Sequence, residues 1–113
     1  MTTRRDWRDR SAVSRAYYAA FNISRRWLEA NVTPIHNRGA HGQVWRIFQA
    51  ADRATPATRE AWILVGSLGD SLRALRNEAD YAEIVPGLGG SVLNAVRDTE
   101  RILVLLPKLE LAD

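Results

Sequence analysis

The fold of this protein is decided first by residues 13–28, which read VSRAYYAAFNISRRWL. Apolar side chains recur there at Val13, Ala16, Tyr17, Ala20, Phe21, Trp27 and Leu28. Steps of three and four residues place side chains on one face of an α-helix, which turns once about every 3.6 residues. The stretch therefore predicts an amphipathic helix over about residues 11–30, with Asp9 or Ser11 as its N-cap.

The same period recurs in later segments. Residues 41–51 predict a short second helix, because Val44, Ile47, Phe48 and Ala51 share one side. Thr55 and Pro56 favour the start of a third helix, since threonine caps free amides and proline suits the first helical position. We expect that helix to continue to about Glu83, with an apolar stripe at Ala61, Val65, Leu68, Leu72, Leu75 and Ala79.

A run of helix breakers, Pro86-Gly87-Leu88-Gly89-Gly90, separates the third helix from a fourth. We expect Ser91 to cap the fourth helix, Pro107 to end it, and its apolar stripe to comprise Val92, Val96, Thr99, Leu103 and Leu106. No segment alternates with the period of two that is typical of strands. The predicted fold is all-α, an up-and-down bundle of four to five helices, with one domain over residues 1–113.

Composition excludes several classes of protein. The chain has 113 residues, 46% of them apolar, and no Cys. It therefore has no disulfide framework, thiolate zinc site or thiol nucleophile, and it suits a reducing compartment. Residues 1–10 lack the apolar run of a signal peptide, and no stretch reaches the roughly 18 apolar residues of a membrane span. We expect a cytoplasmic protein without a membrane partner.

Positive charge is concentrated near the start of the chain. The net charge is +3, but residues 1–38 contain eight arginines and three acidic residues. All but one of the 16 basic residues are arginines, which favour bidentate contact with phosphate or carboxylate. Two interpretations remain open, an anion-binding surface and a general preference for arginine over lysine on solvated faces.

Metal and cofactor chemistry find no support in the sequence. His36 and His41 are the only histidines, and their spacing of five residues does not form the i, i+4 ligand pair of zinc enzymes. The Gly-x-Ser-x-Gly pattern of serine hydrolases is absent. We expect no metal and no cofactor.

Two glycines, Gly66 and Gly69, lie inside the third predicted helix, where each costs about 1 kcal/mol relative to alanine. Close packing offsets such a cost. We expect Gly66 and Gly69 to mark a contact between helices or across a dimer interface.

Residues 73–81, which read RALRNEADY, contain the most informative polar side chain. Arg76 lies only about 60° from the centre of the apolar stripe, so its guanidinium requires a partner close to the core. Asp80, four residues later, is placed to be that partner. The simpler interpretation is an ordinary flanking salt bridge, worth a few tenths of a kcal/mol when exposed.

The polar side of the first helix mixes aromatic and basic residues, with Arg15, Tyr18, Asn22, Arg25 and Arg26 opposite the apolar stripe. Such a surface can stack a base or hold a phosphate. The alternative is a face covered by solvent or by a partner protein.

Three blocks resemble the HEPN (higher eukaryotes and prokaryotes nucleotide-binding) domain family: SRAYYAAF at 14–21, HGQVWRIF at 41–48 and RNEADY at 76–81. The resemblance covers about residues 11–105. It implies a bundle of four or five helices, a homodimer, and a place beside a minimal nucleotidyltransferase in toxin-antitoxin or defence modules. Many members are metal-independent ribonucleases. In these members an arginine is followed, after four to six intervening residues, by a histidine, and two copies of this motif meet across the dimer cleft.

The chain departs from this pattern where the histidine belongs, because Tyr81, Ala82 and Glu83 stand there. Asp80 and Tyr81 instead follow the Ala-Asp-Tyr variant of a branch that lacks the histidine. An aspartate with a pKa of about 4 is a poor acid-base group for cleavage by the 2′-OH, so we expect no nuclease activity.

The resemblance assigns roles to several residues. Arg76, Asn77, Asp80 and Tyr81 are the candidate cleft residues. The mixed aromatic and basic side of the first helix makes Arg15, Tyr18 and Arg25 candidates for ligand or partner contacts. The family commonly has a further helix before the first block. We expect a dimer mate, another protein or a short turn around Trp7 to replace that helix.

Three functions follow as hypotheses. The first is an RNA- or nucleotide-associated HEPN-like component of a toxin-antitoxin or defence module, paired with a nucleotidyltransferase. The second is a metal-independent ribonuclease that uses Arg76 and Asn77 with an unusual acid-base group. The third is a structural interaction bundle whose basic first helix binds an acidic protein partner.

Overall fold

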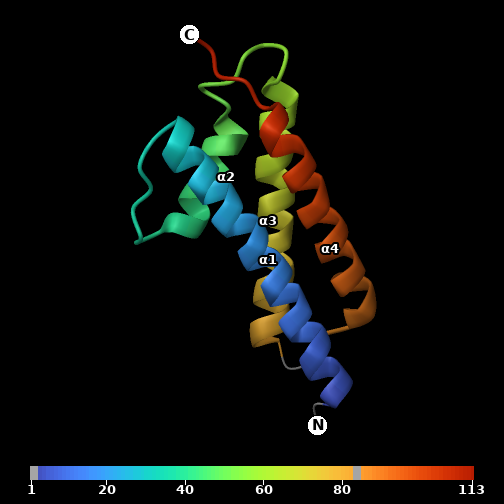
Figure 1. The fold of residues 1–113 in the computed structure, drawn as a ribbon. Helices are drawn as coiled ribbons and strands as arrows, with labels where there is room; N and C mark the ends of the chain where they lie inside the picture. Colours follow the sequence, from blue (N-terminus) through green and yellow to red (C-terminus); the bar gives the residue numbers. More distant parts are fainter. Residues whose placement is uncertain (1–2, 83–84) are drawn as a thin grey trace.

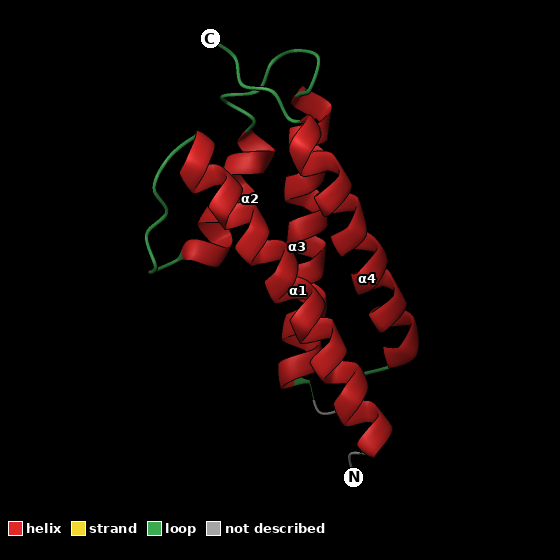
Figure 2. Ribbon diagram, viewed as in Figure 1, coloured by secondary structure: helices red, strands yellow, loops and turns green. Residues whose placement is uncertain are grey.

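The protein folds into a bundle of four α-helices, which confirms the predicted all-α class (Figure 1, Figure 2). A computed structural model describes residues 3–82 and 85–113. The helices are α1 (Arg4–Asn31), α2 (Ala40–Ala50), α3 (Arg59–Tyr81) and α4 (Leu88–Leu105), and a short 3-10 helix η1 (Leu106–Lys108) follows α4. The described residues contain no strand, only one isolated antiparallel bridge between Ala54 and Leu111.

The three long helices run side by side along the molecule, and the shorter α2 packs beside α3 near one end (Figure 1). The molecule is elongated, with principal extents of 54, 27 and 17 Å. The length follows from α1, whose 28 residues rise by about 1.5 Å each. None of the described helices is both long and apolar enough to cross a membrane.

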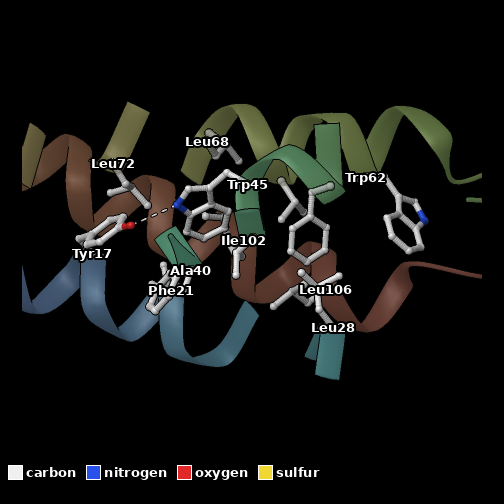
Figure 3. Packing of buried hydrophobic residues seen from close by; sticks show 14 of the residues in the cluster. Tyr17, Phe21, Leu28, Ala40, Trp45, Trp62, Leu68, Leu72, Ile102 and Leu106 are labelled. Atoms are coloured by element: carbon white, nitrogen blue, oxygen red, sulfur yellow. Dashed lines mark hydrogen bonds between the residues drawn. The ribbon is translucent and has the colours of Figure 1, made fainter. Parts of the chain in front are cut away.

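Aromatic rings fill the centre of the bundle (Figure 3). Trp45, Phe48 and Trp62 are fully buried, and Trp27 packs edge-on against Trp62 with the ring centroids 5.2 Å apart. Aromatic pairs of this geometry stabilise a core beyond the area that they bury. The rings join α1, α2 and α3 into one core.

Gly66 and Gly69 allow α3 to approach α2 closely, as predicted. A Cβ atom on Gly69 would collide with the Trp45 ring, and one on Gly66 would lie 2.8 Å from the carbonyl oxygen of Trp45. Only glycine leaves room for the indole at this crossing, so the contact between the helices offsets the low helix propensity.

Helix α1 begins seven residues earlier than the periodicity predicts, and neither Asp9 nor Ser11 caps it. The N-cap is Thr3, whose Oγ1 accepts a hydrogen bond from the Asp6 amide at 3.0 Å. The Asp6 carboxylate accepts one in return from the Thr3 amide, which completes a capping box. Because Trp7 lies in this helical extension and is 68% exposed, no turn around Trp7 replaces a further helix.

Arg10, in the same extension, joins α1 to the end of α3. Its Nη1 donates hydrogen bonds to the carbonyl oxygens of Ala79 at 2.8 Å and Ala82 at 2.6 Å. The last carbonyls of a helix lack intrahelical donors and carry partial negative charge, so an arginine there is stabilising. This contact positions the Arg76 region of α3 against α1.

Helix α3 begins at Arg59, so Thr55 and Pro56 do not start it. They form a turn before the helix, in which the Thr55 amide donates a hydrogen bond to the Glu110 carbonyl at 3.2 Å. The C-terminal segment thus draws this turn away from helical geometry. At its other end α3 stops at Tyr81, and the predicted terminus at Glu83 lies outside the described residues.

Helix α4 begins at Leu88, so the predicted breaker is wrong in part and Ser91 is not its cap. The N-cap is Gly87 in the left-handed conformation, with φ 66°, and Gly89 and Gly90 lie in the first turn. The buried positions of α4 are Leu88, Ala95, Thr99 and Ile102, whereas Val96 and Leu103 of the predicted stripe are exposed. Small Ala95 permits close packing, and Thr99 donates a hydrogen bond to the Ala16 carbonyl at 3.1 Å.

Candidate functional site

Arg76 is the one charged residue that is buried among the described residues, with an exposed fraction of 9%. It lies on α3 beside the apolar stripe, as its helical position predicts. Its guanidinium carbon lies 5.1 Å from the centre of the Tyr17 ring and 5.5 Å from that of Tyr18, both on α1. Cations are attracted to aromatic faces within about 6 Å, so the two tyrosines hold Arg76 at the boundary of the core.

Asp80 pairs with Arg76, which confirms the prediction from their spacing. Arg76 Nη1 lies 3.7 Å from Asp80 Oδ2. Ser14, on α1, donates a hydrogen bond of 2.7 Å to the other carboxylate oxygen of Asp80. We call Ser14, Tyr17, Tyr18, Arg76 and Asp80 the Arg76 cluster.

Positive charge around the cluster is only partly neutralised. The pair with Asp80 is long, and the buried Nε of Arg76 has no hydrogen-bond partner within the described residues. The buried Nε of Arg73, one turn earlier on α3, also lacks a partner there. Buried donors without acceptors are costly, so the described residues leave both the charge and part of the hydrogen-bonding capacity of these two arginines uncompensated.

His41 is the functional candidate that sequence reasoning missed. It lies in the first turn of α2, and its ring stacks on Phe21 with the ring centroids 4.0 Å apart. Its Nδ1 lies 2.7 Å from the Tyr17 hydroxyl oxygen, which in turn accepts a hydrogen bond from Trp45 Nε1 at 3.2 Å. Figure 3 shows the Trp45 indole directed at the Tyr17 hydroxyl. We call Trp45, Tyr17 and His41 the His41 relay.

The relay determines which nitrogen of His41 carries the proton. An indole N–H only donates, so the Tyr17 oxygen is the acceptor for Trp45. We assign the proton of the Tyr17 hydroxyl to the 2.7 Å hydrogen bond with His41 Nδ1. Burial raises the pKa of Tyr17 above its ordinary value, so the phenol keeps that proton. We infer that neutral His41 has its proton on Nε2.

Burial also lowers the pKa of His41 below its ordinary value, and the positive charges of Arg76, Arg73 and Arg25 lower it further. His41 is therefore neutral at physiological pH. Its Nε2–H is a hydrogen-bond donor that carries no charge of its own but lies among arginines.

The other predicted site residues do not all converge on the cluster. Asn77 is exposed, and Tyr81 is 77% exposed. Arg25 is engaged elsewhere, because it donates hydrogen bonds to the Ile35 carbonyl at 2.9 Å and to Asn37 Oδ1 at 2.8 Å. Arg25 thereby holds the loop that precedes α2, and it influences His41 through its charge alone.

A surface hollow of about 410 Å³ adjoins the cluster at the start of α1. Trp7, Arg10, Ser11, Ser14, Arg15, Ala79 and Asp80 line it. Arg15 thus lines this hollow. The hollow leads from solvent to Asp80, at the edge of the Arg76 cluster.

No group of three or more His, Cys, Asp or Glu side chains gathers within the residues that the structure describes. Comparisons with protein-family models, with curated proteins and with solved structures give no match for this chain. Function is therefore inferred from the site itself.

The sequence signal for His41 was the block that begins at this residue. His41 and Arg76 belong to different helices, so their separation along the chain does not predict that they lie close together once the helices pack.

Proposed function

We propose that this protein is an RNA- or nucleotide-associated HEPN-like module that binds phosphate at the Arg76 cluster. The observation that carries the proposal is the guanidinium of Arg76, which is held against Tyr17 and Tyr18 at the boundary of the core and is paired with Asp80 only at 3.7 Å. The resemblance of three sequence blocks to the HEPN family adds the expected setting. That setting is a toxin-antitoxin or defence module with a nucleotidyltransferase-type partner.

The chemistry of the cluster suits a phosphate. Arginine presents two parallel donors to phosphate oxygens, and such charge-assisted contacts are stronger than neutral hydrogen bonds. Arg73 lies one helical turn from Arg76, so a single anion can interact with both guanidinium groups. The exposed face of Tyr18 lies beside Arg76 and offers a surface on which a base can stack.

The proposal does not include RNA cleavage. Among the described residues near Arg76, His41 is the side chain whose ordinary pKa is closest to neutrality. Its Nδ1, however, is hydrogen-bonded to Tyr17, and its Nε2 carries the proton. A nitrogen that already holds a proton does not accept another from a 2′-OH. Asn77, which the ribonuclease hypothesis pairs with Arg76, is exposed on the surface of α3.

Binding of a fluorescent single-stranded RNA tests the proposal. Arg76→Met keeps an extended side chain against the tyrosines but removes the charge, and we expect it to weaken binding at low salt by about tenfold or more. The slope of log affinity against log salt concentration should fall by about one. Arg53→Met, at an exposed arginine in the turn after α2, is the matched control and should have a much smaller effect.

The same preparation separates the two alternatives. Equal affinity of the wild type and Arg76→Met for RNA contradicts phosphate binding at the cluster. RNA cleavage by the purified protein that Arg76→Met abolishes selects the ribonuclease hypothesis. Failure to bind RNA at low salt, together with salt-resistant binding of an acidic protein, selects the interaction bundle.

A further inference from the structure

We propose that His41, Arg73 and Arg76 form one binding site for a phosphate group, in which His41 donates a neutral hydrogen bond from Nε2. This inference rests on the proposed function and names the contacts that recognise the anion. The site joins α2 to α3 beside the aromatic face of α1.

The first turn of α2 contributes to the site by its position. His41 and Gly42 are the second and third residues of α2, and the N-cap Gly39 provides no side-chain hydrogen bond. Amides at the start of a helix have no intrahelical acceptor and carry partial positive charge, which favours an anion there. This feature alone does not define a site, but it adds to the charge of the side chains around it.

Two arginine side chains lie over the same turn. A Cβ atom on Gly42 would be 3.4 Å from Arg73 Nη1 and 3.8 Å from Arg46 Nη1. Neither Arg46 nor Arg73 forms an ion pair within the described residues, whose two ion pairs are Arg25–Glu29 and Arg76–Asp80. Like charges gathered at the positive end of a helix repel one another. A bound anion converts that repulsion into attraction.

The His41 relay then selects the donor. Because Tyr17 binds Nδ1, the partly exposed imidazole has only Nε2 left for a ligand. Phe21 stacks on the ring and Trp45 anchors the Tyr17 hydroxyl, so the donor is held in a defined direction. A neutral donor among arginines adds a hydrogen bond to phosphate without adding repulsion.

Anion binding and protonation of His41 are linked. The groups that face the imidazole are Tyr17, Tyr18 and Arg25 of α1 and Arg73 and Arg76 of α3. A phosphate opposes the field of these arginines, so it raises the pKa of His41 toward its ordinary value. By linkage, the site binds phosphate more tightly as the pH falls.

Nuclear magnetic resonance of the wild-type protein tests the inference without any variant. Long-range ¹H–¹⁵N correlation at pH 8 should show the His41 proton on Nε2. Addition of inorganic phosphate, of AMP and of a single-stranded RNA in separate titrations should shift His41 Nε2 and raise its titration midpoint. Exposed His36 serves as the internal control and should move much less. The titration that saturates at the lowest concentration identifies the source of the phosphate.

Variants provide a second readout through RNA affinity. His41→Ala removes the donor and should weaken binding by about tenfold. His41→Gln supplies an amide N–H and should stay within about threefold of the wild type. His36→Ala should bind like the wild type.

The outcomes separate this inference from the proposed function. If phosphate and RNA leave His41 Nε2 unmoved while Arg76→Met still loses affinity, His41 is not a ligand and the phosphate site lies at Arg76 alone. A proton found on Nδ1 also overturns the inference. If Arg76→Met binds as well as the wild type, the proposed function itself fails.

Discussion

At the scale of single residues, the site depends on polar groups placed at the boundary of an aromatic core. Arg76 is held there by cation–π contacts and one long ion pair, and His41 by a hydrogen bond to a buried phenol. Both groups lose hydration on folding and gain only partial replacement from protein partners.

The stability of the fold should therefore depend on the ionisation of His41. Folding lowers the pKa of His41, so between the folded and unfolded pKa values the unfolded chain binds more protons. This contribution to stability is fully present above the unfolded pKa of about 6.5 and is lost as the pH falls through the folded pKa.

Urea denaturation at pH 7.5 and pH 5.5 measures this effect. From pH 7.5 to pH 5.5, the urea concentration at the unfolding midpoint should decrease more for the wild type than for His41→Gln, because glutamine has no ionisable group. Both proteins contain the same carboxylates, so the contribution of these groups to the pH dependence cancels in the comparison. An equal decrease in the two proteins contradicts the assignment of a lowered pKa to His41.

At the scale of elements, the crossing of α2 and α3 determines where the site forms. Trp45 occupies the space that Gly69 leaves, and its indole nitrogen then reaches Tyr17 on α1. One side chain thus fixes the contact between two helices and anchors the relay to His41. The distance between α2 and α3 sets the position of the imidazole relative to Arg73 and Arg76.

Gly69→Ala should destabilise the fold by at least about 2 kcal/mol, because the added Cβ collides with the Trp45 ring. The matched control is Gly89→Ala in the first turn of α4, where a Cβ meets nothing within 4 Å. We expect that change to stabilise the protein by about 0.5–1 kcal/mol through helix propensity. The free energy of unfolding in urea measures both, and equal values for the two variants refute the close contact.

At the scale of the whole molecule, one face of the bundle exposes apolar side chains to solvent. Leu93, Val96, Leu103 and Val104 of α4 are all exposed and fall within an arc of about 100° around the helix. Glu100 lies between them and Arg97 beside them. A second copy packed antiparallel on this face would bury the apolar side chains and would bring each Glu100 near Arg97 of the other copy.

We therefore expect the homodimer that the family resemblance implies to form through α4. Sedimentation should give twice the mass of the chain for the wild type, and Val96→Glu should give a monomer. Ile23→Glu on α1 is the matched control, since Ile23 and Val96 are both 40% exposed. A dimer that survives Val96→Glu but not Ile23→Glu places the interface on α1 instead.

The sequence predicted the helical elements better than their ends. Apolar periodicity located α2 and the core faces of α1 and α3, because side-chain burial follows the helical repeat. The start of α1 was missed because Thr3 and Asp6 cap it before any apolar period begins. The buried face of α4 was predicted only in part: Thr99 and Leu106 are buried, whereas Val96 and Leu103 are exposed. Several faces of α4 carry apolar residues, and packing against α1 selects among them.

The sequence by itself determined the all-helical class, the close contact at Gly66 and Gly69, and the pairing of Arg76 with Asp80. These features depend on spacings of three or four residues along one helix or on the size of one side chain. Only the tertiary structure decided that His41 lies near Arg76 and is hydrogen-bonded to Tyr17, because these residues belong to three different helices. Their distance is set by the packing of Trp45 against Gly69, which no local pattern encodes.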